Sequence, residues 1–413
     1  MTIRPLALAA VAVSAFAVSL LAAPAAAAQP SGLPAPAAEA LAAIERAGSD
    51  SHSDALLVLR DGEVLLERYR EGEPAPIELM SATKSVVAIG VGLLLAQEHL
   101  ESLDAPVSTW YPEWRQGRKA DITVRMLLEH TSGLQNTPNA GAEIYPAPDV
   151  VQLALAAELD SAPGDRFSYN NKATNLLAGV IARASGQPMD EYLAEHLFAP
   201  LGIEPDTWHR DDAGNPHAMA GLPLTARDAA RLGQLLLDDG RLADGTRLLP
   251  EGFVEEMFAP GARSERVGLL WWRVPEWQRV TLDEGATAYL AANEASADFI
   301  DALRPLAGRG FDSIDDALRA SLGEDYVEPW VEQVRERGLD SRKVFNVEDG
   351  PVVAYRADGY LGQYIVVVPA QRLVAVRQIR SREGEGTHPP DSDYPGFSRD
   401  VIALAQALSG DTP

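Results

Sequence analysis

Strand-forming segments near both ends of this chain enclose a long stretch with helical periodicity. Residues 54–69, DALLVLRDGEVLLERY, form two apolar runs around Asp61-Gly62, and Asp-Gly between such runs is a strong hairpin signal. Helical spacing of apolar residues then persists for about 150 residues. Strand character returns in residues 265–275 and 351–379. We therefore predict an α/β (α+β) fold in which the first and last strands pair within one sheet, with a helical subdomain at about residues 100–260 inserted between them.

Residues 1–28 have the pattern of a secretory signal peptide. A basic residue precedes an apolar stretch, and the small residues up to Ala28 match an A-x-A cleavage site. An uncleaved membrane anchor is the alternative, but the helix-breaking Pro24 before the cleavage site argues against it. We expect a protein exported to the periplasm or the extracellular space without stable membrane insertion, with a Pro/Ala linker at 29–40 and one globular domain at 41–413.

The composition excludes several kinds of chemistry. The chain has no cysteine, which excludes disulfides, cysteine nucleophiles and thiolate metal sites. A net charge of −25 disfavours a nucleic-acid partner, because phosphate binding needs clustered lysine and arginine. Neither the Gly-x-Ser-x-Gly of α/β-hydrolases nor the His-Glu-x-x-His of zinc peptidases is present, and the seven histidines show no metal-ligand spacing. We therefore expect no metal and no cofactor, and we interpret His130 as a structural residue at a helix end, with a place in the cleft wall as the alternative.

A serine and a lysine stand three residues apart where the helical stretch begins. Ser81 and Lys84 share one helical face, so the two side chains can touch. A serine hydroxyl becomes a nucleophile when a base takes its proton, and a lysine is such a base only when its surroundings keep the amine neutral. The apolar run that follows Lys84 and the helix N-terminus both disfavour an ammonium. A capping serine with a solvated lysine is the alternative interpretation.

A second polar pattern, Tyr169-Asn170-Asn171, lies directly before another apolar helix. Alternation in an extended loop would point Tyr169 and Asn171 the same way. A phenol near a lysine can shuttle a proton, and an amide can orient a substrate carbonyl or the lysine itself. In the alternative, Asn171 caps the helix and Tyr169 packs against its neighbours.

A third pattern, GYLGQ at residues 359–363, opens an apolar strand. The glycines at its first and fourth positions would allow a substrate to approach the backbone closely. The backbone N–H of Gln363, with that of Ser81 at its helix N-terminus, could form an oxyanion hole. A glycine-relieved bend at the start of a strand is the alternative.

Together these patterns resemble the serine hydrolases of the class C β-lactamase type, which include DD-peptidases, family VIII carboxylesterases and 6-aminohexanoate-dimer hydrolases. The resemblance covers most of the chain after the leader, apart from residues 276–348. It implies the β-lactamase and DD-peptidase architecture, an antiparallel sheet flanked by helices. The segments that carry it are SATK at 81–84, ITVRMLLEHTSGL at 122–134, FSYNN at 167–171, GLPLTARDAARLGQLLLDDG at 221–240 and GYLGQYIVVVP at 359–369.

The resemblance also implies roles for individual residues. Ser81 would be the nucleophile and Lys84 its base, while Tyr169 and Asn171 would form the second motif of the family. The third motif departs from the family pattern, because Tyr360-Leu361-Gly362 stands where Lys-Thr-Gly is expected. Tyr360 brings no positive charge to bind a substrate carboxylate, so we predict weak turnover of penicillins and cephalosporins.

The expected function is that of a secreted serine hydrolase that cleaves an ester or amide bond of a small-molecule acyl substrate through a covalent acyl-serine intermediate. A β-lactamase, a D-amino-acid peptidase and a non-catalytic binding or sensor domain on the same fold are the alternatives. The presence of Ser81, Lys84 and Tyr169 together favours the enzyme. These patterns predict neither the natural substrate nor the oligomeric state.

Residues 276–348 lie outside the resemblance and have apolar residues at helical spacing in three segments. We predict a small helical insertion there. It begins directly after one predicted strand and ends before the strand of the third pattern, so it can lean over the site as a wall or a lid. A peripheral decoration and a surface for pairing subunits are the alternatives.

Overall fold

The computed structural model describes residues 32–137, 139–335, 337–381 and 393–410. The predicted signal peptide lies outside the described residues, and so does the beginning of the predicted linker. In the described part of the chain, no helix is both long enough and apolar enough to cross a bilayer.

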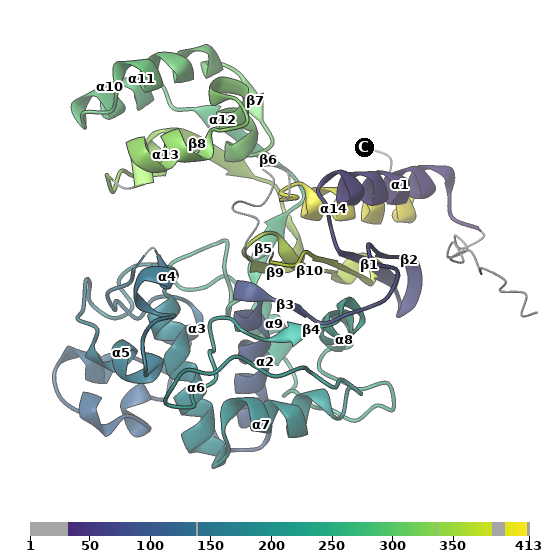
Figure 1. Ribbon diagram of the computed structural model, residues 1–413, viewed down its shortest axis with the longest axis vertical. Coiled ribbons are helices and arrows are strands. Elements are labelled where there is room, and N and C mark those ends of the chain that lie inside the picture. Colours follow the sequence, from purple (N-terminus) through teal and green to yellow (C-terminus); the bar gives the residue numbers. More distant parts are fainter. Residues whose placement is uncertain (1–31, 138, 336, 382–392, 411–413) are drawn as a thin grey trace, which may run out of the picture.

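A six-stranded antiparallel sheet forms the centre of the molecule (Figure 1). Its strand order is β2-β1-β11-β10-β9-β5, so the first hairpin lies beside the last strand. Ala55 on β1 pairs with Gln378 on β11, which confirms the prediction that the first and last strands pair. The strands are β1 (Ala55–Arg60), β2 (Glu63–Tyr69), β5 (Trp272–Pro275), β9 (Val352–Gly359), β10 (Gln363–Val368) and β11 (Leu373–Gln378).

The predicted turn between β1 and β2 is present. Asp61 and Gly62 have backbone φ angles of 50° and 79°. Two successive residues in the left-handed region form the tight turn that matches the twist of the flanking strands. Glycine adopts this region freely and aspartate tolerates it, which is why Asp-Gly is a strong sequence signal.

Two helices from opposite ends of the chain cover one face of the sheet. Helix α1 (Ala35–Asp50) packs beside α14 (Phe397–Ser409), and apolar side chains of both form a core with the sheet (Figure 1). The predicted linker is therefore wrong for residues 35–40, which belong to α1. Pro36 does not prevent the helix, because proline fits the first helical turn, where the N–H has no helical acceptor.

The opposite face of the sheet carries the helical subdomain and the larger core. Successive residues of β10 point to the two sides, since Val367 belongs to the helical core and Val366 to the core under α1 and α14. Helix α2 is buried along nearly its whole length, as its almost uncharged sequence predicts. The helices are α2 (Thr83–Ala96), α3 (Val124–Leu128), α4 (Ala140–Glu143), α5 (Val150–Ala156), α6 (Asn171–Ser185), α7 (Met189–Leu193), α8 (Ala226–Leu237) and α9 (Phe253–Phe258), with a small sheet of β3 (Ile77–Glu78) and β4 (Pro223–Leu224).

The insertion has a core of its own and is not purely helical. The prediction of helices is right for its middle but wrong for its two ends, which pair as strands β6 and β8. Two segments that leave and re-enter the main sheet side by side can satisfy each other's backbone hydrogen bonds. The elements are β6 (Gln278–Leu282), α10 (Ala286–Ala292), α11 (Ala297–Leu303), β7 (Gly310–Phe311), α12 (Ile314–Leu322), α13 (Val327–Trp330) and β8 (Phe345–Asp349), with strand order β7-β6-β8.

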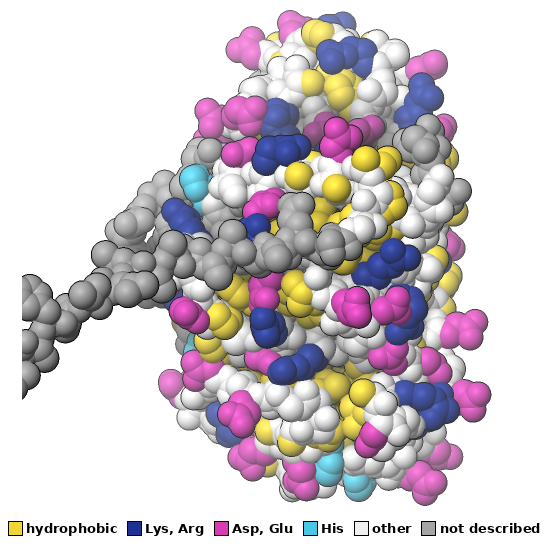
Figure 2. All heavy atoms as spheres, turned by 90° about the vertical axis from the view of Figure 1, so that its right-hand side faces the viewer, with side chains coloured by type: hydrophobic (Ala, Val, Ile, Leu, Met, Phe, Trp, Pro, Cys, Tyr) yellow, Lys and Arg dark blue, Asp and Glu magenta, His cyan; other side chains and the backbone are white. Residues whose placement is uncertain are grey.

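The surface mixes charges of both signs. On the described part of the face in Figure 2, lysine and arginine side chains alternate with aspartate and glutamate and form no single basic patch.

Candidate active site

Ser81 lies in a short 3₁₀ turn, Met80–Ala82, that leads into α2. Met80 has a backbone φ of 48°, in the left-handed region that a non-glycine residue adopts at a cost. The Leu79 N–H donates to the Leu222 carbonyl at 2.9 Å, which anchors the turn to the chain before β4. The N–H of Ser81 belongs to the first turn of a helical segment, where backbone N–H groups have no helical acceptor. This turn therefore presents both a hydroxyl and an N–H to a substrate.

Lys84 lies one turn further along the same face and is 2% exposed. Its Nζ is 2.9 Å from Ser81 Oγ and donates to the Met219 carbonyl at 2.7 Å. Burial lowers the pKa of Lys84 well below that of a free lysine. A neutral amine at this distance can accept the hydroxyl proton, so the structure brings together the pair that the sequence predicts.

A buried asparagine that the sequence reasoning missed holds the acceptor of Lys84 in place. Asn175, on α6, is fully buried, and its Oδ1 accepts from the Met219 N–H at 3.1 Å. Met219 thus donates its backbone N–H to Asn175 and accepts from Lys84 through its backbone carbonyl. No local pattern indicates this role, because Met219 is distant in sequence from both residues.

Tyr169 lies over the same two groups. Its ring centroid is 5.0 Å from Lys84 Nζ, and it lines the same small cavity as Ser81. Burial raises the pKa of Tyr169 to about 12, and the charge of Asp358 adds to this shift. The phenol is therefore protonated near neutral pH and can donate a proton at the nucleophile.

Asn170, and not Asn171, caps helix α6. The Asn170 Oδ1 accepts from the Ala173 N–H at 2.9 Å, and its Nδ2 donates to the Leu134 carbonyl at 2.6 Å. The alternative in which Asn171 is the cap is therefore wrong. Asn171 is the first residue of α6, and its Oδ1 is buried without a hydrogen-bond partner among the described residues. Such an unsatisfied buried acceptor is uncommon, because most buried polar atoms in folded proteins have a hydrogen-bond partner.

His130 contributes to the wall of the site, which was the alternative to a purely structural role. Its ring centroid is 4.5 Å from that of Tyr169, and its Nδ1 accepts from the Asn170 N–H at 3.2 Å. Burial, with a smaller contribution from Lys84, lowers the pKa of His130 to about 3, so the ring is neutral. Its backbone φ of 56° is in the left-handed region, two residues after α3 ends at Leu128.

The predicted third motif is wrong about which residues face Ser81. Tyr360 is 72% exposed and does not line the cavity at Ser81. Gly362 faces Arg377, because a Cβ built on Gly362 would lie 2.4 Å from a guanidinium nitrogen of that residue. The Gln363 side chain is fully buried and binds the backbone of Ile379 at 2.5 and 3.1 Å.

The last two residues of β9 take the place that the sequence analysis gave to Tyr360 and Gly362. Asp358 lines the cavity at Ser81. Gly359 packs against the Ser81 turn, because a Cβ there would lie 2.3 Å from the Leu79 carbonyl oxygen and 3.1 Å from the Ala82 nitrogen. The sequence contains two glycines three residues apart, and only the strand register decides which one meets Ser81.

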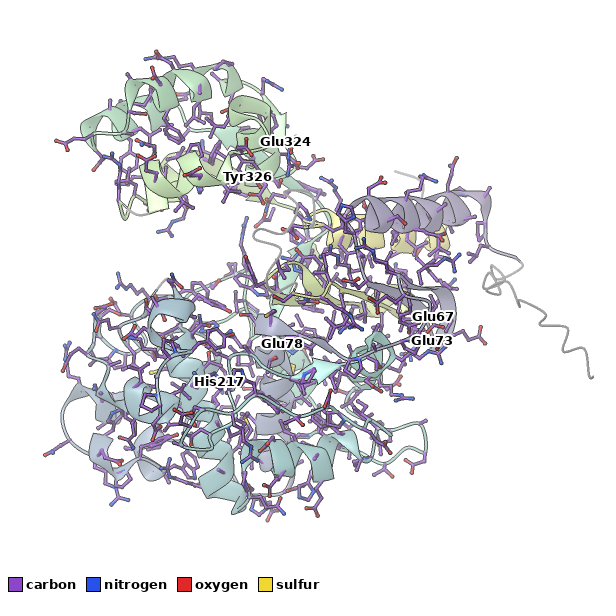
Figure 3. The ribbon with its side chains drawn as sticks, viewed as in Figure 1. Glu67, Glu73, Glu78, His217, Glu324 and Tyr326 are labelled. Atoms are coloured by element: carbon purple, nitrogen blue, oxygen red, sulfur yellow. The ribbon has the colours of Figure 1, made fainter. Side chains whose placement is uncertain are left out.

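Two adjoining cavities surround these groups. A small cavity at Ser81 is completed by Ser85, Val267, Leu270, Trp272 and Asp358. Trp272 and Asp358 also line a larger cavity of about 950 Å³, which we call the insertion groove because α12 and the segment before it form part of its wall. Asp315 of that wall belongs to the insertion, as does Tyr326 (Figure 3). The cavity at Ser81 thus adjoins a groove that extends to the insertion.

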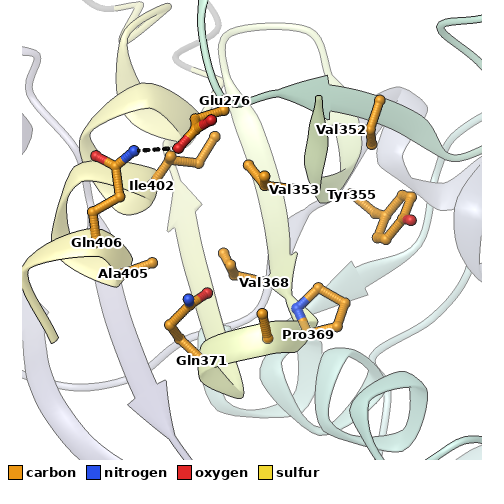
Figure 4. Close-up of a pocket in the computed structure, with 11 residues that line it drawn as sticks. Glu276, Val352, Val353, Tyr355, Val368, Pro369, Gln371, Ile402, Ala405 and Gln406 are labelled. Carbon is orange, nitrogen blue, oxygen red and sulfur yellow. Dashed lines mark hydrogen bonds between the residues drawn. The ribbon is translucent and has the colours of Figure 1, made fainter. Parts of the chain in front are cut away.

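A third cavity, of about 500 Å³, lies elsewhere on the molecule (Figure 4). It is lined mainly by apolar side chains such as Val353, Val368 and Ile402, and its polar contact is a 2.9 Å hydrogen bond from Gln406 to Glu276. None of the lining residues is a nucleophile paired with a base, so this cavity has no catalytic arrangement.

His217 packs against other rings in the helical subdomain. It is 1% exposed and stacks on His209 and Tyr145, with ring centroids 4.9 and 5.6 Å away. Burial lowers its pKa to about 4, so the ring is neutral at physiological pH. Figure 3 places it in the helical subdomain near Glu78.

Comparison with known proteins bears out the resemblance in the sequence. A model of the β-lactamase family matches residues 41–394. The 6-aminohexanoate-dimer hydrolase of Paenarthrobacter ureafaciens is 30% identical over 242 residues, which cover 53% of this chain and 60% of that protein. Esterase EstB of Burkholderia gladioli is 32% identical over 176 residues, which cover 36% of this chain and 44% of that protein. The matches thus span about half the length of these curated relatives.

Solved structures agree on the fold. A penicillin-binding protein homologue from Caulobacter crescentus has a TM-score of 0.55 at 16% identity, over 92% of this chain and 98% of that chain. A penicillin-binding protein from Bacillus halodurans has a TM-score of 0.54 at 16% identity, over 88% of this chain and 99% of that chain. The fold is therefore that of β-lactamases and penicillin-binding proteins. Since the family model covers most of its length, the chain belongs to the β-lactamase family.

Proposed function

We propose that this protein is a serine hydrolase that cleaves an ester or amide bond of a small acyl substrate through an acyl-serine intermediate. The single observation that carries this proposal is the buried pair of Lys84 Nζ and Ser81 Oγ, 2.9 Å apart. A hydroxyl is activated when a neutral base lies within hydrogen-bond reach. The names of the two relatives, a dimer hydrolase and an esterase, support hydrolysis and leave the choice between ester and amide open.

In the acylation step, Ser81 Oγ forms a bond to the substrate carbonyl carbon while its proton moves to Lys84 Nζ. The carbonyl π electrons move to oxygen, which becomes an oxyanion. When the tetrahedral intermediate collapses, the bond to the leaving group breaks and that group takes a proton from Tyr169, which recovers one from Lys84. Water then attacks the acyl-serine, and the same groups carry the proton in reverse to release the acid.

The oxyanion needs backbone donors that are fixed before the reaction. The N–H of Ser81 is one, since it lies at the start of a helical segment. We assign the second to the N–H of Tyr360, because it follows Gly359, the residue packed on the Ser81 turn. The sequence analysis gave this role to Gln363, which the register instead pairs with Gly359 in the β9–β10 ladder.

Substitution of the nucleophile tests the proposal. Ser81→Ala should abolish both labelling by a fluorophosphonate probe and hydrolysis of p-nitrophenyl acetate, with an unchanged circular dichroism spectrum. Ser108→Ala, at a buried serine in the turn Val107–Thr109, is the matched control and should label like the parent protein. A parent protein that takes no label would favour the alternative, a binding or sensor domain on the same fold. Full activity of Ser81→Ala would refute the nucleophile assignment.

The proposal extends to location and to the insertion. The pattern of residues 1–28 supports export to the periplasm or the extracellular space, where a small-molecule acyl substrate would be met.

The insertion would act as a wall of the substrate site, since Asp312, Asp315 and Arg319 line the groove that shares Trp272 with the catalytic cavity.

A further inference from the structure

Asp358 is the one carboxylate among the described residues that line the cavity at Ser81. Burial disfavours a positive charge on two other ionisable groups there, because it lowers the pKa of Lys84 well below that of a free lysine and the pKa of His130 to about 3. The phenol of Tyr169 is also neutral, since its pKa is raised to about 12. Among the described residues that line this cavity, Asp358 is therefore the group that can bring a negative charge to the nucleophile.

The partner of Asp358 points away from the nucleophile. Arg356 contacts Asp358 Oδ2 at 2.6 Å, and its other terminal nitrogen donates to Ser398 Oγ on α14 at 3.1 Å. Arg356 lines the insertion groove but not the cavity at Ser81. Burial raises the pKa of Asp358, whereas the adjacent guanidinium of Arg356 acts in the opposite direction and favours the ionised form of the carboxylate. The ion pair thus places its negative end at the catalytic cavity and its positive end toward α14.

The charged side chains that line the insertion groove do not offset the negative charge of Asp358. Each of its arginines has a carboxylate partner within 4.0 Å, such as Asp349 for Arg266 at 2.7 Å and Asp312 for Arg399 at 3.3 Å. Asp315 and Asp393 also line the groove, and neither forms an ion pair within the described residues. A substrate that extends from Ser81 into the groove therefore meets an excess of negative charge.

We propose that Asp358 sets the substrate class of this site by charge: it favours acyl compounds with an ammonium or another cationic group near the scissile carbonyl and disfavours those with a carboxylate there. This inference rests on the proposed hydrolase function. The sequence analysis predicted weak turnover of penicillins and cephalosporins from the missing positive charge at Tyr360. Asp358 now takes the place of Tyr360 in that argument, because Asp358 lines the cavity at Ser81 and Tyr360 does not. A carboxylate-bearing penicillin or cephalosporin would then be repelled and not merely unassisted.

Three isosteric substrates measure this preference directly. β-Alanyl, butanoyl and succinyl p-nitroanilides present an ammonium, a methyl and a carboxylate at the same distance from the carbonyl. At low ionic strength we expect kcat/KM for the β-alanyl compound to exceed that for the succinyl compound by at least about tenfold, and added salt should shrink this ratio. In Asp358→Asn the ratio should fall toward unity. A ratio near unity in the parent protein, or an unchanged ratio in Asp358→Asn, would overturn the inference.

The controls separate failure of the inference from failure of the proposed function. Asp104→Asn removes another carboxylate paired with an arginine, Arg125 at 2.8 Å, but lines neither cavity, so it should keep the parent ratio. If that variant also loses the preference, net charge and not Asp358 is responsible. If the parent protein hydrolyses none of the three anilides and takes no fluorophosphonate label, the hydrolase proposal itself fails. If Asp358→Asn does not fold, the salt dependence of the parent ratio still decides, because a salt-independent ratio contradicts a charge effect.

Discussion

The contact between Gly359 and the Ser81 turn allows a quantitative prediction. In Gly359→Ala the new Cβ would lie 2.3 Å from the Leu79 carbonyl oxygen, whereas ordinary contact begins at 3.4 Å. The backbone of β9 and the Ser81 turn must therefore separate by about 1 Å, a displacement that can reduce catalysis about 100-fold. This corresponds to about 2.7 kcal/mol in activation free energy. The free energy of unfolding should fall by only about 1–3 kcal/mol, as for other overpacked sites.

The assay compares kcat/KM for p-nitrophenyl acetate, the rate of fluorophosphonate labelling and the melting temperature. Gly285→Ala is the matched control, because it lies at the N-cap of α10 with φ −88° and its Cβ would approach only the flexible Asp283 carboxylate, at 3.1 Å. It should retain parent activity. If Gly359→Ala hydrolyses the ester within threefold of the parent rate while folded, close packing of β9 on the nucleophile turn is not needed for catalysis.

Three further predictions concern the base and the insertion. Because burial lowers the pKa of Lys84, kcat/KM should rise with pH at values well below 10.5. It should not decline again until the pH approaches about 12, which is the pKa of Tyr169. A rise that occurs only near pH 10 would contradict a neutral lysine base. At pH values between the pKa of Lys84 in the folded protein and its higher pKa in the unfolded chain, the unfolded chain binds more protons than the folded protein. The free energy of unfolding should therefore increase with pH in this range. Urea titrations of the parent protein and Lys84→Met at several pH values would measure this contribution. Replacing Gln278–Asp349 with a short Gly/Ser bridge should change the selectivity between acetate and bulky acyl esters while Ser81 is still labelled; identical kinetics on every ester would mean that the insertion does not contact substrates.

The parts of the site that the sequence predicted depend on local geometry. Ser81 and Lys84 are three residues apart at the start of a helix, so their contact follows from helical periodicity once the helix is recognised. Tyr169 follows from its place directly before α6. The hairpin at Asp61-Gly62 was predictable for the same reason, since a dipeptide determines the turn.

The parts that the sequence missed depend on contacts between distant segments. The register of β9 against β10 and the approach of β9 to Leu79 decide which residue of β9 contacts the Ser81 turn. The spacing of apolar residues in the sequence predicts neither of these. Asn175 reaches Lys84 only through the peptide at Met219. The pairing of β6 with β8 joins the two ends of a long insertion, whose separate segments carry only helical signals.

The position of the insertion connects its folding to the chemistry. Strand β5 runs directly into β6, and β8 runs directly into β9, so the paired strands β6 and β8 are continuous with neighbouring strands of the main sheet. Arg266 before β5 and Asp349 at the end of β8 form a 2.7 Å ion pair across this junction. Strand β9 then carries Asp358 and Gly359 to the nucleophile turn. Since the insertion has its own core, sequence changes within it can reshape the groove while Ser81 and Lys84 keep their places at the start of helix α2.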